Sequence, residues 1–78
     1  MEATVKITLE QTIKAAKTSR NGIAVEGKIR PATINELCKG ESKAISFETL
    51  RKIVDALNTL DTSGKQHTIE DVMTIEYK

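Results

Sequence analysis

The strongest constraint on the fold is a short segment, residues 27–40 (GKIRPATINELCKG), that marks both ends of a helix. Pro31 suits the first helical position, where a backbone N–H would have no intrahelical partner. The residue before a proline is pushed into an extended conformation, which makes Arg30 the N-cap. Gly40 suits the left-handed conformation in which helices commonly end. The sequence therefore predicts a helix over residues 31–39 with a fixed start and a fixed end.

This helix should have one buried face and one polar face. Ile29, before the cap, and Ile34 form a hydrophobic staple that fixes the angle at which the chain enters the helix. At about 100° per residue, Leu37 and Cys38 lie on the same side as Ile34. The opposite side carries residues that suit contact with water or with a ligand, namely Ala32, Asn35, Glu36 and Lys39.

Capping residues and apolar spacing predict three further helices. Residues 8–11 (TLEQ) have the pattern of a capping box and open a helix that runs to about residue 17. Ser19 is a candidate N-cap for a short helix over about residues 20–26. Ser46 starts the longest amphipathic pattern in the chain. Its apolar positions are Phe47, Leu50, Ile53, Val54, Leu57 and Leu60.

The remaining segments are predicted to form a loop, a last helical turn and a pair of strands. Residues 58–66 are polar and rich in turn-forming residues. A second capping-box pattern at residues 68–71 opens one or two turns through Met73. Residues 4–7 and 74–77 alternate with β-branched residues, so the chain ends could pair as a two-stranded ribbon. An isolated pair of strands is marginal, so the ribbon needs packing against the helices or a partner chain.

Size and composition indicate one small globular domain. The chain has 78 residues, of which 38% are apolar and 29% charged, near the average for globular domains. A core this small cannot divide, so we expect a single domain over residues 1–78, with its core in 9–60 and extensions at 1–8 and 61–78. A single cysteine, no signal-peptide pattern and no apolar run of about 20 residues favour a cytoplasmic protein.

The charge is small in total but uneven along the chain. The net charge is +1, which argues weakly against a strongly basic nucleic-acid binder. Residues 18–43 carry five basic and three acidic side chains, whereas residues 44–78 carry four basic and six acidic ones. This gradient would orient the middle of the chain toward a polyanion, although a difference of this size is also common by chance.

The two short helices predicted at residues 20–26 and 31–39, with four residues between them, fit a helix-turn-helix. In that motif the second helix enters the DNA major groove, and its N-terminal residues lie nearest the base edges. Arg30 would then lie where it can contact a guanine or a phosphate. Asn35 is of the residue type that binds adenine through two hydrogen bonds.

Residues 9–60 resemble the Cro/repressor-type (XRE-like) helix-turn-helix family. Its members commonly carry G-[VI]-S-x-x-T-I-S-x-[IL]-x-x-G, followed by I-S-x-x-T-L-x-K-I-x-x-A-L. The corresponding segments here are KIRPATINELCKG at residues 28–40 and ISFETLRKIVDAL at residues 45–57. The resemblance implies a mainly α fold, a compact lambda-repressor-like bundle of four to five short helices that binds operator DNA, often as a dimer. Lys28 stands where the turn glycine is usual, and Arg30 where the N-cap serine is usual.

Position by position, the resemblance implies a set of DNA contacts. The base-proximal positions are Arg30, Pro31, Ala32, Asn35 and Glu36. The positions of phosphate contacts are Ser19, Arg20, Lys28, Lys39, Ser42 and Lys43. Phosphate contacts set affinity and register, whereas base contacts set sequence preference. Glu36 opposes close approach to phosphate, but its carboxylate could accept a hydrogen bond from cytosine.

Two functions are compatible with these features. The favoured hypothesis is a sequence-specific DNA-binding transcriptional regulator, a repressor of bacterial, phage or mobile-element origin that occludes a promoter as a homodimer on double-stranded DNA. The alternative is a protein-interaction module, antitoxin-like or an adaptor, built on the same scaffold; the acidic half, residues 44–78, favours it modestly. No enzyme activity, metal or cofactor is predicted, because Cys38 lies on the apolar stripe and His67 stands alone at a loop end.

Overall fold

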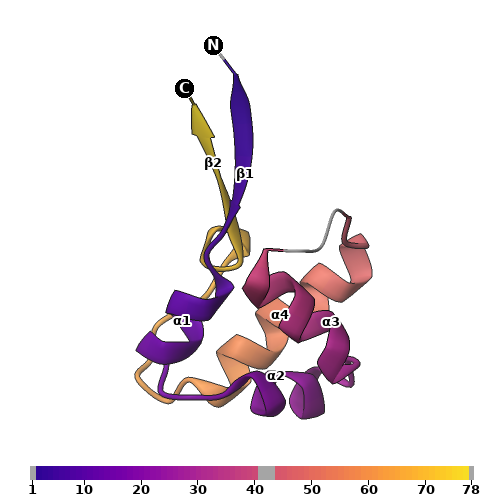
Figure 1. The fold of residues 1–78 in the computed structure, drawn as a ribbon. Helices are drawn as coiled ribbons and strands as arrows, with labels where there is room; N and C mark the ends of the chain where they lie inside the picture. The colour runs from indigo at the N-terminus through magenta and orange to yellow at the C-terminus, as the bar shows by residue number, and fades with distance from the viewer. Residues whose placement is uncertain (1, 41–43, 78) are drawn as a thin grey trace.

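The structure of the protein, a computed structural model, describes residues 2–40 and 44–77. Figure 1 shows the helices gathered in one body, from which a ribbon made by the two chain ends projects. In chain order the elements are β1 (Ala3–Ile7), α1 (Leu9–Ala15), α2 (Arg20–Gly27), α3 (Pro31–Lys39), α4 (Phe47–Leu60), the 3-10 turn η1 (Ile69–Asp71) and β2 (Met73–Tyr77). The predicted fold class, a mainly α bundle with a small terminal ribbon, is confirmed. Within the described residues no helix has the length and apolar character needed to span a bilayer.

Two serine caps start α2 and α4, as predicted. The Ser19 hydroxyl accepts a hydrogen bond from the Gly22 backbone N–H at 2.9 Å. The Ser46 hydroxyl accepts from the Thr49 N–H at 3.1 Å. Each bond satisfies a backbone donor that the helix itself leaves unpaired, which stabilises the helix by about 1 kcal/mol relative to alanine.

The predicted limits of α3 are also confirmed. Pro31 is its first residue, and Arg30 before it is extended, with φ −63° and ψ 132°. Gly40 follows its last residue with a φ of 74°, in the left-handed region. Ile29 packs against the core cluster that contains Ile34, as the staple requires. The limits of α3 are therefore set by Pro31 and Gly40, and the packing of Ile29 fixes how the chain enters it.

The turn between α2 and α3 uses a lysine where the family commonly has glycine. Lys28 adopts the left-handed conformation, with φ 56° and ψ 46°. For a residue with a Cβ atom this conformation costs about 1 kcal/mol. Gly27, one position earlier, is needed for a different reason: a Cβ atom there would lie 2.9 Å from Ile29 Cδ1 and 3.3 Å from the Lys52 carbonyl oxygen. Gly27 thus lets α2 pack closely on α4, while Lys28 makes the turn.

One core joins all four helices to the C-terminal segment. The fully buried large side chains are Leu9, Ile23, Ile34, Leu37, Ile53, Leu57 and Val72. Burial of each such side chain stabilises the fold by roughly 1.5–3 kcal/mol. Val72 follows η1, so the segment after the family-like region also belongs to the core.

The start and the end of α1 differ from the prediction. The Thr8 hydroxyl does not cap α1; it donates a hydrogen bond to the Glu70 carbonyl oxygen at 3.0 Å. Thr8 has φ −111° and ψ 4°, which is not the extended conformation of a side-chain cap. The predicted capping box is therefore wrong, because a carbonyl group from the distant C-terminal segment binds the hydroxyl instead. The helix ends at Ala15, and Lys17, with a φ of 56°, turns the chain away.

The C-terminal segment forms one turn, opened by the predicted capping box of Thr68 and Asp71, but this turn ends at Asp71 instead of running through Met73. The turn η1 ends at Asp71, and the Asp71 carboxylate accepts from the Thr68 N–H at 3.1 Å. Thr12 on α1 donates to the Asp71 carbonyl oxygen at 2.6 Å. These contacts stop the helical turn early and direct residues from Met73 onward into β2.

The terminal ribbon has one apolar and one polar face. β1 and β2 pair antiparallel, with Ala3 opposite Tyr77 and Ile7 opposite Met73. Directly paired residues share a face, so the apolar face carries Ala3, Val5, Ile7, Met73, Ile75 and Tyr77. The other face carries Thr4, Lys6, Thr74 and Glu76, and the Lys6 ammonium lies 3.2 Å from a Glu76 carboxylate oxygen.

Phe47 departs from the predicted apolar stripe of α4. The other predicted positions are buried or half-buried, but Phe47 is 91% exposed. On a helix, Phe47 lies about 120° around the axis from Ile53, which is fully buried. The amphipathic pattern is therefore correct for α4 as a whole but too wide at its first residue.

Candidate nucleic-acid interface

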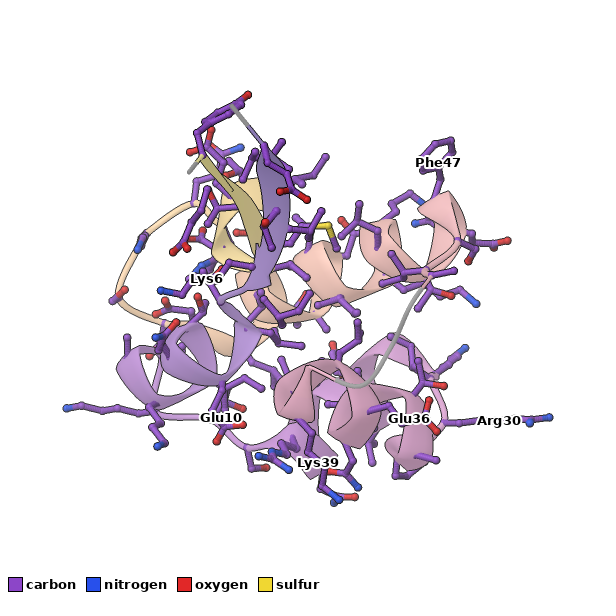
Figure 2. The ribbon with its side chains drawn as sticks, turned by 45° about the horizontal axis from the view of Figure 1, so that its top comes forward. Lys6, Glu10, Arg30, Glu36, Lys39 and Phe47 are labelled. Carbon is purple, nitrogen blue, oxygen red and sulfur yellow. The ribbon has the colours of Figure 1, made fainter. Side chains whose placement is uncertain are left out.

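The N-terminal end of α3 presents an arginine without a partner. Arg30 is exposed, and its side chain makes no hydrogen bond or ion pair with any residue that the structure describes. Figure 2 shows its side chain extended away from the body of the molecule. Pro31 and Ala32, which follow, are exposed and small, so they leave space for a surface to approach. A guanidinium group in this position can donate to guanine O6 and N7 or to a phosphate.

The outer face of α3 is polar and its inner face holds the helix in place. Glu36 and Lys39 are exposed and lie on the same side of the molecule as Arg30 (Figure 2). Ile34 and Leu37 are buried in the core. The predicted division of α3 into a buried and a polar face is confirmed for these positions, so α3 can present its exposed side chains without moving.

Arg20, a predicted phosphate contact, is held within the protein. Its guanidinium Nε and Nη2 lie 2.8 and 2.6 Å from Glu10 Oε2 on α1. Its Nη1 donates to Asn35 Oδ1 on α3 at 3.3 Å. Its side chain is 36% exposed, and that of Glu10 is 32% exposed. Arg20 thus connects α1, α2 and α3, and its role toward phosphate stays a prediction.

The contact with Arg20 orients Asn35. Binding an adenine edge requires an amide oxygen that accepts and an amide N–H₂ that donates. The Asn35 oxygen faces Arg20, but a carbonyl oxygen can accept two hydrogen bonds. The arrangement leaves the Asn35 N–H₂ group without a partner among the described residues, so the predicted base contact is compatible with the geometry.

Cys38 completes this cluster as a half-buried thiol whose proton is held more tightly than usual. Burial raises the pKa of Cys38 to about 11, and its hydrogen bond to Glu10 acts in the same direction. The hydrogen bond from Arg20 is the main cause that lowers the pKa of Glu10, and the bond from Cys38 adds to it. Cys38 therefore stays protonated and donates to the carboxylate, as expected from its place on the apolar stripe.

The other predicted phosphate contacts are distributed around α2 and α3. Ser19 caps α2, where its hydroxyl is already an acceptor for a backbone N–H. Lys28 in the turn and Lys39 in the last turn of α3 are exposed, and neither side chain has a partner within the part of the chain that is described. Ser42 and Lys43 lie outside the described residues. The exposed cations Lys28, Arg30 and Lys39 thus flank the single exposed carboxylate predicted at the site, Glu36.

A second polar cluster was not predicted. His67 is buried, with 3% of its surface exposed. Its Nε2 lies 2.7 Å from Asp61 Oδ2 and its Nδ1 lies 3.0 Å from Asp71 Oδ2. Each ring nitrogen of His67 thus has a carboxylate oxygen within hydrogen-bond distance.

The backbone of His67 is held as firmly as its ring. The Asn58 side chain on α4 accepts from the His67 N–H at 2.6 Å and donates to the His67 carbonyl oxygen at 3.3 Å. We refer to Asn58, Asp61, His67 and Asp71 together as the C-terminal clamp. Hydrogen bonds from the Ser63 side chain and backbone, and then from His67, lower the pKa of Asp61 to about 2. The spacing of the two aspartates around His67 was visible in the sequence, but only the folded loop brings them to the same ring.

The described residues of the clamp form no metal site. In residues 2–40 and 44–77, no group of three or more His, Cys, Asp and Glu side chains is placed so that it could hold a metal ion. The ring nitrogens of His67 are both bonded, so neither is available as a general base. The clamp therefore joins the C-terminal segment to α4, while the exposed groups around α3 form the candidate interface.

Comparison with known proteins supports this assignment. A family model described as the Cro/C1-type HTH DNA-binding domain matches residues 8–59. The match begins just before α1 and ends within α4, so it includes the whole candidate interface. Searches of curated proteins and of solved structures gave no significant match.

Proposed function

Because the chain belongs to the Cro/C1-type helix-turn-helix DNA-binding family, we propose that it is a sequence-specific transcriptional regulator that places α3 in the DNA major groove. The observation that carries the proposal is Arg30, an exposed arginine without a described partner at the start of a helix that is fixed at both ends. A base-contacting side chain needs this combination of a free donor group and a rigid support.

The proposed contacts follow from the position of each side chain on α3. Arg30 donates to a guanine or a phosphate, and Asn35, oriented by Arg20, binds an adenine edge. Pro31 and Ala32 allow close approach to the base edges, while Glu36, at a base-proximal position, opposes close approach to phosphate. Ser19, Lys28 and Lys39, together with Arg20, Ser42 and Lys43, are proposed to contact phosphates, and this last group rests on the family resemblance.

We propose repression by occupation of a promoter, in the cytoplasm of a bacterium or from a phage or mobile element. A single module of this size contacts little DNA surface, because such modules bury only about 600–1,000 Å² of protein surface. A homodimer on a palindromic site doubles that contact, and its two-fold symmetry matches that of the site.

Selection of bound fragments from random DNA tests the proposal first, since it reports a motif and its symmetry. The selected site is then titrated with Arg30→Ala and with Lys6→Ala. The second variant removes the same charge from the ribbon, far from Arg30 in Figure 2. We expect Arg30→Ala to weaken binding by about 1–3 kcal/mol, and Lys6→Ala to have little effect. If Arg30 contacts a base, sequence preference at one position relaxes; if it contacts a phosphate, the salt dependence decreases instead.

Two results would contradict this function. One is a random-DNA selection that returns no motif. The other is equal loss of affinity in the Arg30→Ala and Lys6→Ala proteins, which would indicate a general effect of charge. Stable association with another protein, together with only nonspecific DNA binding, would support the alternative of a protein-interaction module on this scaffold.

A further inference from the structure

Glu10 on α1 is bonded to Arg20, although Glu10 itself is not among the predicted DNA contacts. It is the second residue of α1, and its side chain is 32% exposed. In Figure 2 this side chain extends from α1 toward α2 and α3, well apart from Arg30. Its contacts within the protein therefore decide what Glu10 can contribute to the candidate interface.

Two short contacts fix the guanidinium group of Arg20 on Glu10. The Arg20 atoms Nε and Nη2 lie 2.8 and 2.6 Å from the same carboxylate oxygen, Glu10 Oε2. Hydrogen bonds between ionised groups are stronger than those between neutral groups, and a pair of them fixes the direction of the guanidinium as well as its position. Arg20 is the first residue of α2, so the pair also joins α1 to α2.

The remaining nitrogen of this guanidinium determines which way the Asn35 amide faces. Arg20 Nη1 donates to Asn35 Oδ1 at 3.3 Å, a long hydrogen bond that holds little without the support of Glu10. A guanidinium has donors and no acceptor, so only the oxygen of the amide can face it. The Asn35 N–H₂ group must then point the other way.

A fixed amide is more selective than a rotating one. An adenine edge presents a donor, N6–H₂, beside an acceptor, N7. The second lone pair of Asn35 Oδ1 can accept from the first, and the Asn35 N–H₂ group can donate to the second. An amide that can turn over also offers its N–H₂ group to either of the two acceptors of guanine. Holding the Asn35 amide therefore favours adenine over guanine.

The carboxylate of Glu10 is bonded to α3 as well as to α2. Hydrogen bonds from Arg20 and then from Cys38 lower the pKa of Glu10, so its side chain is ionised at neutral pH. Cys38 lies on α3 three residues after Asn35, which places them on neighbouring turns of the same helix face. Glu10 is thus connected to the helix that carries Asn35 by two separate bonds.

This arrangement leaves Arg20 able to contact a phosphate. A guanidinium has five N–H donors, and the contacts with Glu10 and Asn35 use three of them. Two donors remain on a side chain that is 36% exposed. Arg20 can therefore hold Asn35 and contact the DNA backbone at the same time.

We propose that Glu10 is a positioning residue for DNA recognition: it holds Arg20 so that the Asn35 amide keeps one orientation, and this orientation sets the base that Asn35 selects. The inference rests on the proposed function, because it takes Asn35 as a base contact. It gives α1, which lies outside the helix-turn-helix, a part in sequence preference.

NMR relaxation of the Asn35 N–H₂ group tests the positioning in the full chain without DNA. We expect a rigid group in the wild-type protein and a fall of its order parameter below about 0.6, the range of flexible groups, in Glu10→Ala. Glu10→Gln keeps an acceptor oxygen for Arg20, so it should retain most of the rigidity. Glu70→Ala is the matched control, because it removes the same charge from an exposed residue of η1 and should leave Asn35 unchanged.

Base preference on the DNA site selected from random fragments tests the consequence. Asn35→Ala should reduce discrimination at one base pair by about 5- to 150-fold, the range for a contact through two hydrogen bonds. Glu10→Ala should reduce discrimination at the same base pair by about fivefold or more, and Glu70→Ala should not. Once Asn35 is alanine, removal of Glu10 should have no further effect at that base pair. Thermal melts show whether each variant folds.

Three results would overturn the inference. An Asn35 N–H₂ group that is equally rigid in the wild-type and Glu10→Ala proteins would show that Glu10 does not position it. An equal loss of affinity for all sequences would show that Glu10 only stabilises the fold. A gain of affinity for all sequences, with a steeper salt dependence, would show that Glu10 competes with phosphate for Arg20.

The two measurements separate this inference from the proposed function. A selection that returns no motif refutes the proposed function, and the order parameter, measured without DNA, still decides whether Glu10 positions Asn35. A selected motif whose base preferences are the same for the wild-type and Glu10→Ala proteins refutes only the inference.

Discussion

The region around α3 and the C-terminal clamp use their polar side chains in opposite ways. The side chains of Arg30, Glu36 and Lys39 are exposed and have no partner among the described residues. In the clamp, both ring nitrogens of His67 and both of its backbone groups are bonded. The bonded groups of the clamp hold the fold, whereas the unbonded side chains of Arg30, Glu36 and Lys39 are available to a ligand.

The largest expected effect is loss of stability when the clamp is broken. His67→Ala removes two hydrogen bonds to carboxylates, each of a kind that contributes about 1.5–3 kcal/mol, from a buried position. We expect the free energy of unfolding at neutral pH to fall by about 3 kcal/mol, measured by urea denaturation.

The matched control is Gln66→Ala, at the exposed residue next to His67. We expect it to change the free energy of unfolding by no more than about 0.5 kcal/mol. The same small value is expected for Arg30→Ala, whose effect should be confined to DNA binding. Equal destabilisation by His67→Ala and Arg30→Ala would contradict this difference between the two regions.

A smaller effect, and one that depends on pH, is expected at Asp61. Its pKa in the fold is about 2, below the ordinary value of 3.8, so the folded protein binds this proton less readily than the unfolded chain. The stabilisation is therefore complete above pH 3.8 and is lost as the pH falls toward about 2. Asp61→Asn should lower stability at neutral pH and flatten the decline in acid, as measured by thermal melts across this range.

Thr62→Ala serves as the control for that experiment, because Thr62 is an exposed residue of the same loop. It should reproduce the acid decline of the wild-type protein. If the Asp61→Asn protein loses stability in acid as steeply as the wild-type protein, other carboxylates cause that loss.

The smallest expected effect is a change in DNA affinity when the exposed carboxylate on α3 is removed. Glu36→Gln removes the exposed carboxylate among the cations Lys28, Arg30 and Lys39, and it breaks no hydrogen bond in the described structure. We expect DNA affinity at low salt to rise by about 0.5 kcal/mol, with unfolding unchanged. Titration at two salt concentrations measures this. A loss of affinity confined to sites with one particular base pair would instead identify Glu36 as a base contact.

Much of the fold could be predicted because its signals are local. Pro31 and Gly40 mark α3, and Ser19 and Ser46 mark α2 and α4, through contacts within a few residues. Alternation at the chain ends likewise predicted the strands. The extended backbone of Arg30 follows from the same local logic, since the residue before a proline is pushed out of the helical conformation.

The features that escaped prediction depend on residues distant in sequence. The Thr8 hydroxyl binds the Glu70 carbonyl group, 62 positions away, which no capping pattern can reveal. His67 is buried because a loop brings two aspartates to its ring. Arg20 matches a phosphate-contact position, but Glu10 on another helix already binds it. A sequence pattern shows which groups can bond, and the packing of helices decides which of them do.

The ribbon gives the molecule a particular response to force. Both chain ends leave from the same end of β1 and β2, where Ala3 faces Tyr77, while the Ile7–Met73 pair adjoins the helices (Figure 1). A force applied between the termini therefore acts on the paired residues of the two strands one pair at a time. The outermost pair, at Ala3 and Tyr77, separates first. The ribbon would peel open before tension reaches the helices, so domains attached at either end could be drawn apart without disturbing α3.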